Sequence, residues 1–71
     1  MRRFAASDGA LWDAVLGHES WGTFVALFTP VGGGDVRKTT LVEETALSAE
    51  TELGAKTDAE LRALLEDSSP W

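Results

Sequence analysis

The chain of 71 residues has no cysteine and only one histidine. Without cysteine it forms neither disulfides nor thiolate metal sites, so a domain this small depends on packing or on association for its stability. A dedicated metal site normally needs three or four convergent ligands, which one histidine and scattered acids do not supply. We therefore expect no metal and no cofactor.

Long apolar runs are absent as well. No stretch approaches the ~18 apolar residues of a membrane-spanning helix. The start, MRRFAASDG, has two arginines, but only three apolar residues separate them from Ser7. The apolar segment of a signal peptide, roughly 7 to 15 residues, is missing. These features predict a cytoplasmic protein.

The length of the chain limits its core. Surface scaling predicts that a folded chain of 7.6 kDa exposes about 4,300 Å² of the about 11,000 Å² that it exposes when unfolded. That is enough for one domain, 1–71, with one core. A ligand cavity of ~300 Å³ or more would take up much of that core, so we expect no deep catalytic pocket and no small-molecule ligand.

Charge is distributed unevenly. Residues 1–42 carry four basic and four acidic side chains, whereas residues 43–71 carry two basic and eight acidic ones, so the second half holds the whole net charge of −6. A negative field repels phosphate backbones and anionic lipid headgroups, which argues against nucleic acid and membrane as partners. The acidic half is best interpreted as solvated helix surface.

The first half of the chain reads as four strands, at about 2–6, 11–16, 23–29 and 36–42. Ser7-Asp8-Gly9 is typical of a three-residue hairpin loop, which would place Phe4 opposite Trp12 and Arg3 opposite Asp13. Gly17 is expected to end the second strand. The third strand is apolar on both faces, which is usual for a central strand covered on both sides.

The second half reads as two helices, at about 49–53 and 58–67. Ser48 is expected to cap the first helix and Gly54 to end it. Thr57 and Glu60 form a capping box for the second helix, and Pro70 stops it. Trp71 lies beyond that stop, either frayed or folded back. The predicted fold is α+β: a four-stranded antiparallel meander, open or curled into a barrel-like form, with both helices packed on one face.

The stretch GHESWG, residues 17–22, resembles a reactive centre without meeting its requirements. A serine nucleophile elbow needs glycine two residues before Ser20, where this chain has His18. A zinc-binding helix with the motif H-E-x-x-H needs a second histidine at position 22, which is glycine. We interpret the stretch as a turn and predict no catalytic residue.

A second near-match is GGGDVRKT, residues 32–39, which approaches the phosphate-binding pattern G-x-x-x-x-G-K-[ST]. Arg37 replaces the second glycine. The residues after Lys38 favour a strand, whereas the phosphate-binding loop precedes a helix. An ordinary glycine-rich hairpin loop is the better interpretation.

The remaining signal is aromatic. Phe4, Trp12, Phe24 and Phe28 share the helix-covered face of the predicted sheet and are assigned to the core. The other face is left uncovered, and apolar patches of several hundred Å² are seldom bare on monomers. Its predicted partner-binding residues, together with one from the neighbouring loop, are Trp21, Thr23, Val25, Leu27 and His18.

These observations predict a small, non-enzymatic protein-interaction or regulatory module whose partner is another protein or a second copy in a homodimer. One alternative is an SH3-like barrel that binds peptides through its loops. Another is a small enzyme or metal-binding protein that uses His18, Glu19 and Ser20.

Overall fold

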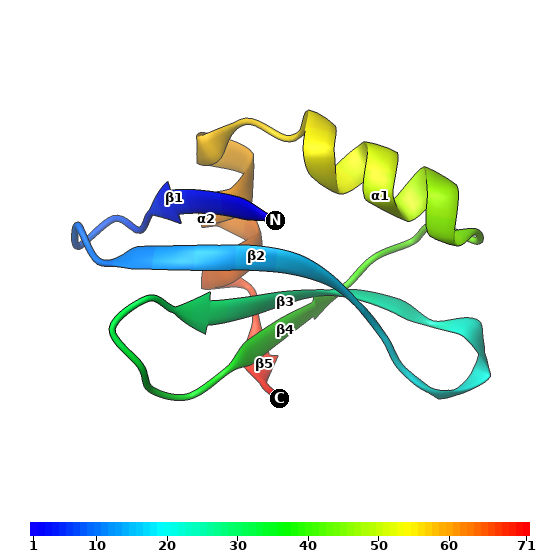
Figure 1. Ribbon diagram of the computed structural model, residues 1–71, viewed down its shortest axis with the longest axis horizontal. Helices are drawn as coiled ribbons and strands as arrows, with labels where there is room; N and C mark the ends of the chain where they lie inside the picture. The colour runs from blue at the N-terminus through cyan, green and yellow to red at the C-terminus, as the bar shows by residue number, and fades with distance from the viewer.

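The computed structural model of the chain describes residues 1–71 apart from the side chain of Trp21 (Figure 1). Its elements, in chain order, are β1 (Arg2–Ala5), β2 (Leu11–His18), the 3₁₀ turn η1 (Ser20–Gly22), β3 (Phe24–Pro30), β4 (Arg37–Thr40), α1 (Ala46–Ala55), α2 (Asp58–Glu66) and β5 (Ser69–Pro70). Among the described residues, neither helix combines the length and the apolar character needed to cross a bilayer.

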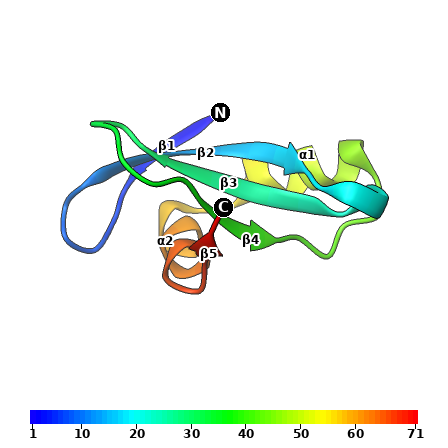
Figure 2. The same ribbon diagram turned by 90° about the horizontal axis from the view of Figure 1, so that it is seen from below.

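The strands form one antiparallel sheet in the order β1-β2-β3-β4-β5, and the α+β class predicted from the sequence is confirmed. The sheet twists strongly along the long β2–β3 hairpin, as Figures 1 and 2 show. It is not closed, because β1 and β5 remain its two edges. The folded chain exposes 4408 Å², close to the value expected for its length.

The register of the first hairpin is the predicted one. Phe4 lies opposite Trp12 and Arg3 lies opposite Asp13. The loop turns at Gly9, whose φ of 87° is accessible to glycine at little cost. Alternation then puts Phe4 in the core, where its ring meets that of Phe28 edge-on at 5.9 Å between centroids.

The largest differences from the sequence-based boundaries lie in three elements, and the other predicted elements differ by one residue at one or both ends. Gly17 does not end β2, which runs on to His18 because β3 pairs with it along its whole length. The strand expected at 36–42 is shorter, Arg37–Thr40, because the chain leaves the sheet after Leu41 donates its N–H to the carbonyl of Phe24. The first helix begins at Ala46, since the hydroxyl of Thr45 rather than that of Ser48 accepts the capping hydrogen bond. Gly54 does not end it, because the helix continues to Ala55 and is capped at Lys56.

The C-terminal end of the chain folds back onto the sheet. The capping box of Thr57 and Glu60 opens α2 as predicted, but after α2 the chain forms β5, a strand that the sequence did not indicate. Arg37 stabilises the segment between α2 and β5 by donating hydrogen bonds to the hydroxyl and the carbonyl of Ser68, at 2.7 and 2.6 Å. Trp71 then donates its N–H to the carbonyl of Val36, so it is folded back rather than frayed.

The core lies between the sheet and the two helices, with α2 on one side of the strands in Figure 2. Its buried members come from every layer of the fold: Phe4, Ala14, Ala26, Phe28, Leu41, Ala49, Leu53 and Leu61. Phe24 and Trp12, which were also assigned to the core, pack against this cluster but remain partly exposed.

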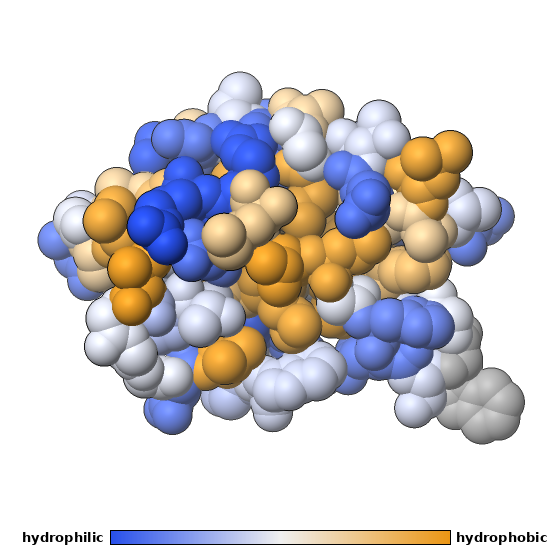
Figure 3. All heavy atoms as spheres, in the orientation of Figure 1, coloured by the Kyte–Doolittle hydropathy of each residue, from blue (hydrophilic) through white to orange (hydrophobic). Residues whose placement is uncertain are grey.

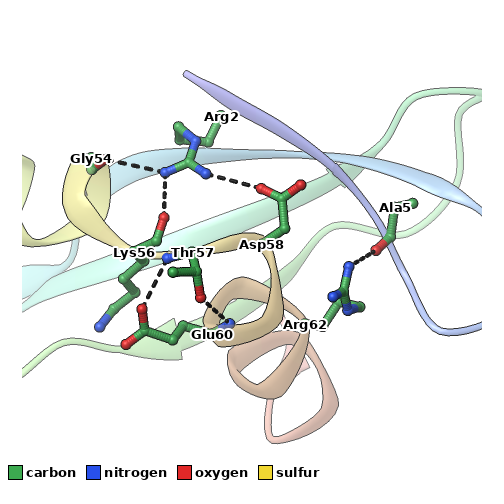
Figure 4. Close-up of polar contacts among 8 residues, drawn as sticks. All are labelled: Arg2, Ala5, Gly54, Lys56, Thr57, Asp58, Glu60 and Arg62. Carbon is green, nitrogen blue, oxygen red and sulfur yellow. Dashed lines mark hydrogen bonds and ion pairs between the residues drawn. The ribbon is translucent and has the colours of Figure 1, made fainter.

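Arg2 joins β1 to the corner between the helices (Figure 4). Its guanidinium donates to the carbonyls of Gly54 and Lys56, at 3.1 and 2.6 Å, and pairs with Asp58 at 3.0 Å. These carbonyls end α1 and would otherwise lack a partner. Arg62 of α2 donates to the carbonyl of Ala5 in the same strand. The position of both helices along β1 is therefore set by charged hydrogen bonds.

Candidate interaction surface

One face of the sheet carries no helix, and we call it the outer sheet face. Alternation along the paired strands assigns its residues. They are Arg3, Ala5, Leu11, Asp13, Val15, Gly17, Thr23, Val25, Leu27, Thr29, Lys38, Thr40 and Ser69. In Figure 3, apolar side chains gather in the middle of the view, over β2 and β3, and polar groups surround them.

The centre of this face is built around Gly17. A Cβ at this position would lie 2.6 Å from Cδ1 of Leu27 and 3.0 Å from Cγ2 of Val25. Both distances are shorter than a normal carbon contact of about 3.5–4.0 Å. The missing side chain thus allows Leu27 to lie across β2, where it stays half-buried.

Val25 is fully enclosed within the single chain. It is 0% exposed, although no helix covers its face of the sheet. Lys38 lies opposite Leu27, while Glu19 follows His18, which lies opposite Phe24. The 2.6 Å ion pair between Lys38 and Glu19 therefore crosses β3 beside Val25. Val25 thus has no accessible area to offer a partner.

The five predicted partner-binding residues do not form one surface. Thr23, Val25 and Leu27 share the outer sheet face, and Thr23 and Leu27 are half-buried. His18 belongs to the other face, since it pairs with Phe24 and its ring stacks on that phenyl ring at 5.0 Å. The side chain of Trp21 lies outside the described residues.

Two exposed apolar residues of this surface were not identified from the sequence. Leu11 is 48% exposed and lies on the outer sheet face opposite Ala5, which the predicted hairpin register already implied. Trp71 is 58% exposed, and the ammonium of Lys38 lies 5.3 Å from its ring centroid, within cation–π range. No sequence signal placed Trp71 there, because its position depends on β5.

The charges of the outer sheet face cancel in pairs. Arg3 and Asp13 form a two-point hydrogen-bonded pair at 2.9 and 3.1 Å, and Lys38 and Glu19 form a second pair. The hydrogen bond from Arg3 lowers the pKa of Asp13, and the same contact raises the pKa of Arg3. The face is thus locally neutral on a chain whose net charge is −6.

The structure does not assemble His18, Glu19 and Ser20 into a reactive group. His18 stacks on Phe24, Glu19 is bound to Lys38, and Ser20 is exposed in η1. Within the described part of the chain, no three His, Asp or Glu side chains come together in a way that could hold a metal ion. The glycine-rich stretch 32–39 leads into strand β4, as expected for a hairpin loop.

Comparison of the chain with protein-family models, with curated proteins and with solved structures found no match.

Proposed function

We propose that this protein is a small, non-enzymatic interaction module in the cytoplasm that forms a homodimer through its outer sheet face. The observation that carries the proposal is a charge-balanced sheet face with apolar residues at its centre, on an otherwise acidic molecule. Leu27, Val15 and Leu11 line it, with Trp71 at its margin. Surfaces of this kind are uncommon on soluble monomers unless they meet a partner.

Electrostatics favours a second copy as that partner. The helical half carries eight acidic and two basic residues, so two copies repel each other wherever their helices approach. The outer sheet face is the exception, because its ion pairs neutralise themselves. A two-fold arrangement that joins these faces also keeps the acidic helices of the two copies far apart.

The available area suits a small dimer. The molecule measures 32 by 22 Å along its two longer axes, so one face offers at most about 700 Å². Pairing two such faces would bury at most about 1,400 Å², within the range of roughly 1,200–2,000 Å² for stable interfaces. Because Val25 is already enclosed, we expect a weak, concentration-dependent dimer rather than an obligate one.

Sedimentation velocity from about 1 to 500 µM tests the proposal. We expect the weight-average sedimentation coefficient to rise with concentration and Leu27→Lys to suppress that rise, because a charge would be buried at the interface. Leu47→Lys is the matched control, since Leu47 is 77% exposed on α1, away from this face. A wild-type protein that stays monomeric throughout the range would refute the proposal, as would an equal effect of the two folded variants.

A further inference from the structure

Only part of the β2 edge that faces β1 forms backbone hydrogen bonds. Leu11 accepts from Val31, and Glu19 donates to Thr23, so the odd-numbered residues from Leu11 to Glu19 bond toward β3. Ala10 accepts from Ala6, so the even-numbered residues bond toward β1. By this alternation the N–H and C=O groups of Leu16 and His18 point to the β1 side.

No strand of the described chain faces those groups. β1 spans Arg2–Ala5, and Arg2 lies opposite Ala14, so its pairing stops before Leu16. Among the described residues, neither Leu16 nor His18 makes a backbone hydrogen bond to a turn, a loop or a side chain on this edge. Unpaired N–H and C=O groups in a row are a template for another strand.

A groove lined by both polar and apolar residues runs along the same edge. It has a volume of about 420 Å³ and lies between β2 and α1. Val15 and Leu16 of β2, Leu53 and Gly54 of α1, and the charged residues Arg2 and Glu50 are among the residues that line it. Figure 3 shows the apolar surface of this part of the molecule beside the polar residues that border it.

We propose that this groove binds an extended segment of a partner protein, which adds to the sheet as a strand beside β2. The free backbone groups of Leu16 and His18 specify the occupant, because only an extended main chain presents donors and acceptors at the matching spacing. Leu16 and Leu53 in the lining favour apolar side chains on the inward face of that segment. Arg2 also lines the groove, but its guanidinium is paired with Asp58, so Glu50 and the net charge of −6 favour lysine or arginine among the others.

A second copy of this chain does not fit the groove. Its own β2 carries β1 along the same edge, so antiparallel pairing beyond three residues would bring Met1 of one copy against the turn after His18 of the other. The occupant is therefore a linear segment, and this site is distinct from the dimer face of the proposed function.

The test uses the full chain at a concentration where sedimentation shows a monomer, with a blocked hexapeptide in which valine alternates with lysine as the probe. In the free protein we expect the amides of Leu16 and His18 to exchange with solvent much faster than those of Val15 and Gly17, which bond to β3. Saturating peptide should slow exchange at Leu16 and His18 by about tenfold or more.

Two control peptides isolate main-chain pairing. Both keep every side chain, and N-methyl groups block the odd amides in one and the even amides in the other. Since one edge of the peptide faces β2, one of these peptides should lose binding and the other should retain it. A peptide of alternating valine and glutamate should bind more weakly than the lysine peptide, because of Glu50 and the net charge.

A pair of protein variants tests the same contact from the other side. His18→Pro removes one edge donor and leaves the bonds to β3, so it should weaken peptide binding about fivefold. His18→Ala removes the imidazole but keeps the donor, and should bind like the wild type. If His18→Pro does not fold, the exchange rates and the methylated peptides decide the matter with the wild-type protein.

The proposal is overturned if Leu16 and His18 are as protected as Val15 and Gly17 in the free protein. It is also overturned if peptide leaves their exchange unchanged at about 1 mM, or if both methylated peptides bind like the parent. Equal weakening by His18→Pro and His18→Ala would show a side-chain contact instead. None of these results depends on whether the outer sheet face forms a dimer.

Discussion

Gly17 offers the sharpest test of how the outer sheet face is packed. In Gly17→Ala the new methyl group would lie 2.6 and 2.7 Å from Cδ1 and Cγ of Leu27 and 3.0 Å from Cγ2 of Val25. Leu27 is half-buried and can rotate outward, but Val25 is enclosed beneath the ion pair of Lys38 and Glu19. Part of the clash therefore remains after relaxation.

The expected magnitude follows from two opposing terms. Overpacking of this kind costs about 1–3 kcal/mol. Replacing a strand glycine by alanine returns about 0.5–1 kcal/mol, because the unfolded chain loses freedom. We therefore expect Gly17→Ala to lower the free energy of unfolding by about 1–2 kcal/mol and the Tm by about 5–15 °C.

Urea unfolding followed by circular dichroism measures this change. Gly54→Ala is the control, since nothing lies within 4 Å of a Cβ at that helical position, and it should stabilise the protein by about 0.5–1 kcal/mol. Combining Gly17→Ala with Leu27→Ala should recover about 1 kcal/mol relative to additivity. The packing argument fails if Gly17→Ala is as stable as the wild type, or if the two substitutions are simply additive.

Two further predictions concern the arginines of β1. Arg2→Met should destabilise the protein by about 1–2 kcal/mol and speed amide exchange at the end of α1, because the carbonyls of Gly54 and Lys56 lose their donor. Arg3→Met should change stability far less, because Arg3 belongs to an exposed ion pair. Equal effects of the two substitutions on stability would contradict this account. The lowered pKa of Asp13 means that its pairing with Arg3 stabilises the fold fully above about pH 4, the pKa of an aspartate in the unfolded chain. This contribution is lost as the pH falls through the pKa of Asp13 in the folded protein. An NMR titration should therefore show the Asp13 pKa rising in Arg3→Gln, and an unchanged value would refute the assignment.

Much of the fold follows from residues close together in the chain. The hairpin register of Phe4 with Trp12 depends on a three-residue loop and on alternation. The start of α2 depends on Thr57 and Glu60, three positions apart. The competing caps Thr45 and Ser48 show where local rules become ambiguous, since both are good capping residues and only the path of the chain from β4 selects between them.

The interaction surface was harder to foresee. The alternation of β3 correctly placed Val25 and Leu27 on one face, but it did not show that Val25 is fully buried, beside an ion pair between residues 19 and 38. His18 was assigned to the partner-binding set because a turn was expected at Gly17. Once β2 continues through that glycine, the pleat carries His18 to the opposite face.

The amino-acid sequence by itself determined the α+β class, the hairpin register, the second helix and the apolar character of both faces of β3, because each rests on periodicity or on side-chain contacts a few residues apart. Tertiary structure alone decided that Ser69–Pro70 returns as a fifth strand, that Lys38 pairs with Glu19 across β3, and that Leu16 and His18 keep an open edge. Each of these depends on distant segments meeting, and loop closure of that kind leaves no local signal in the chain.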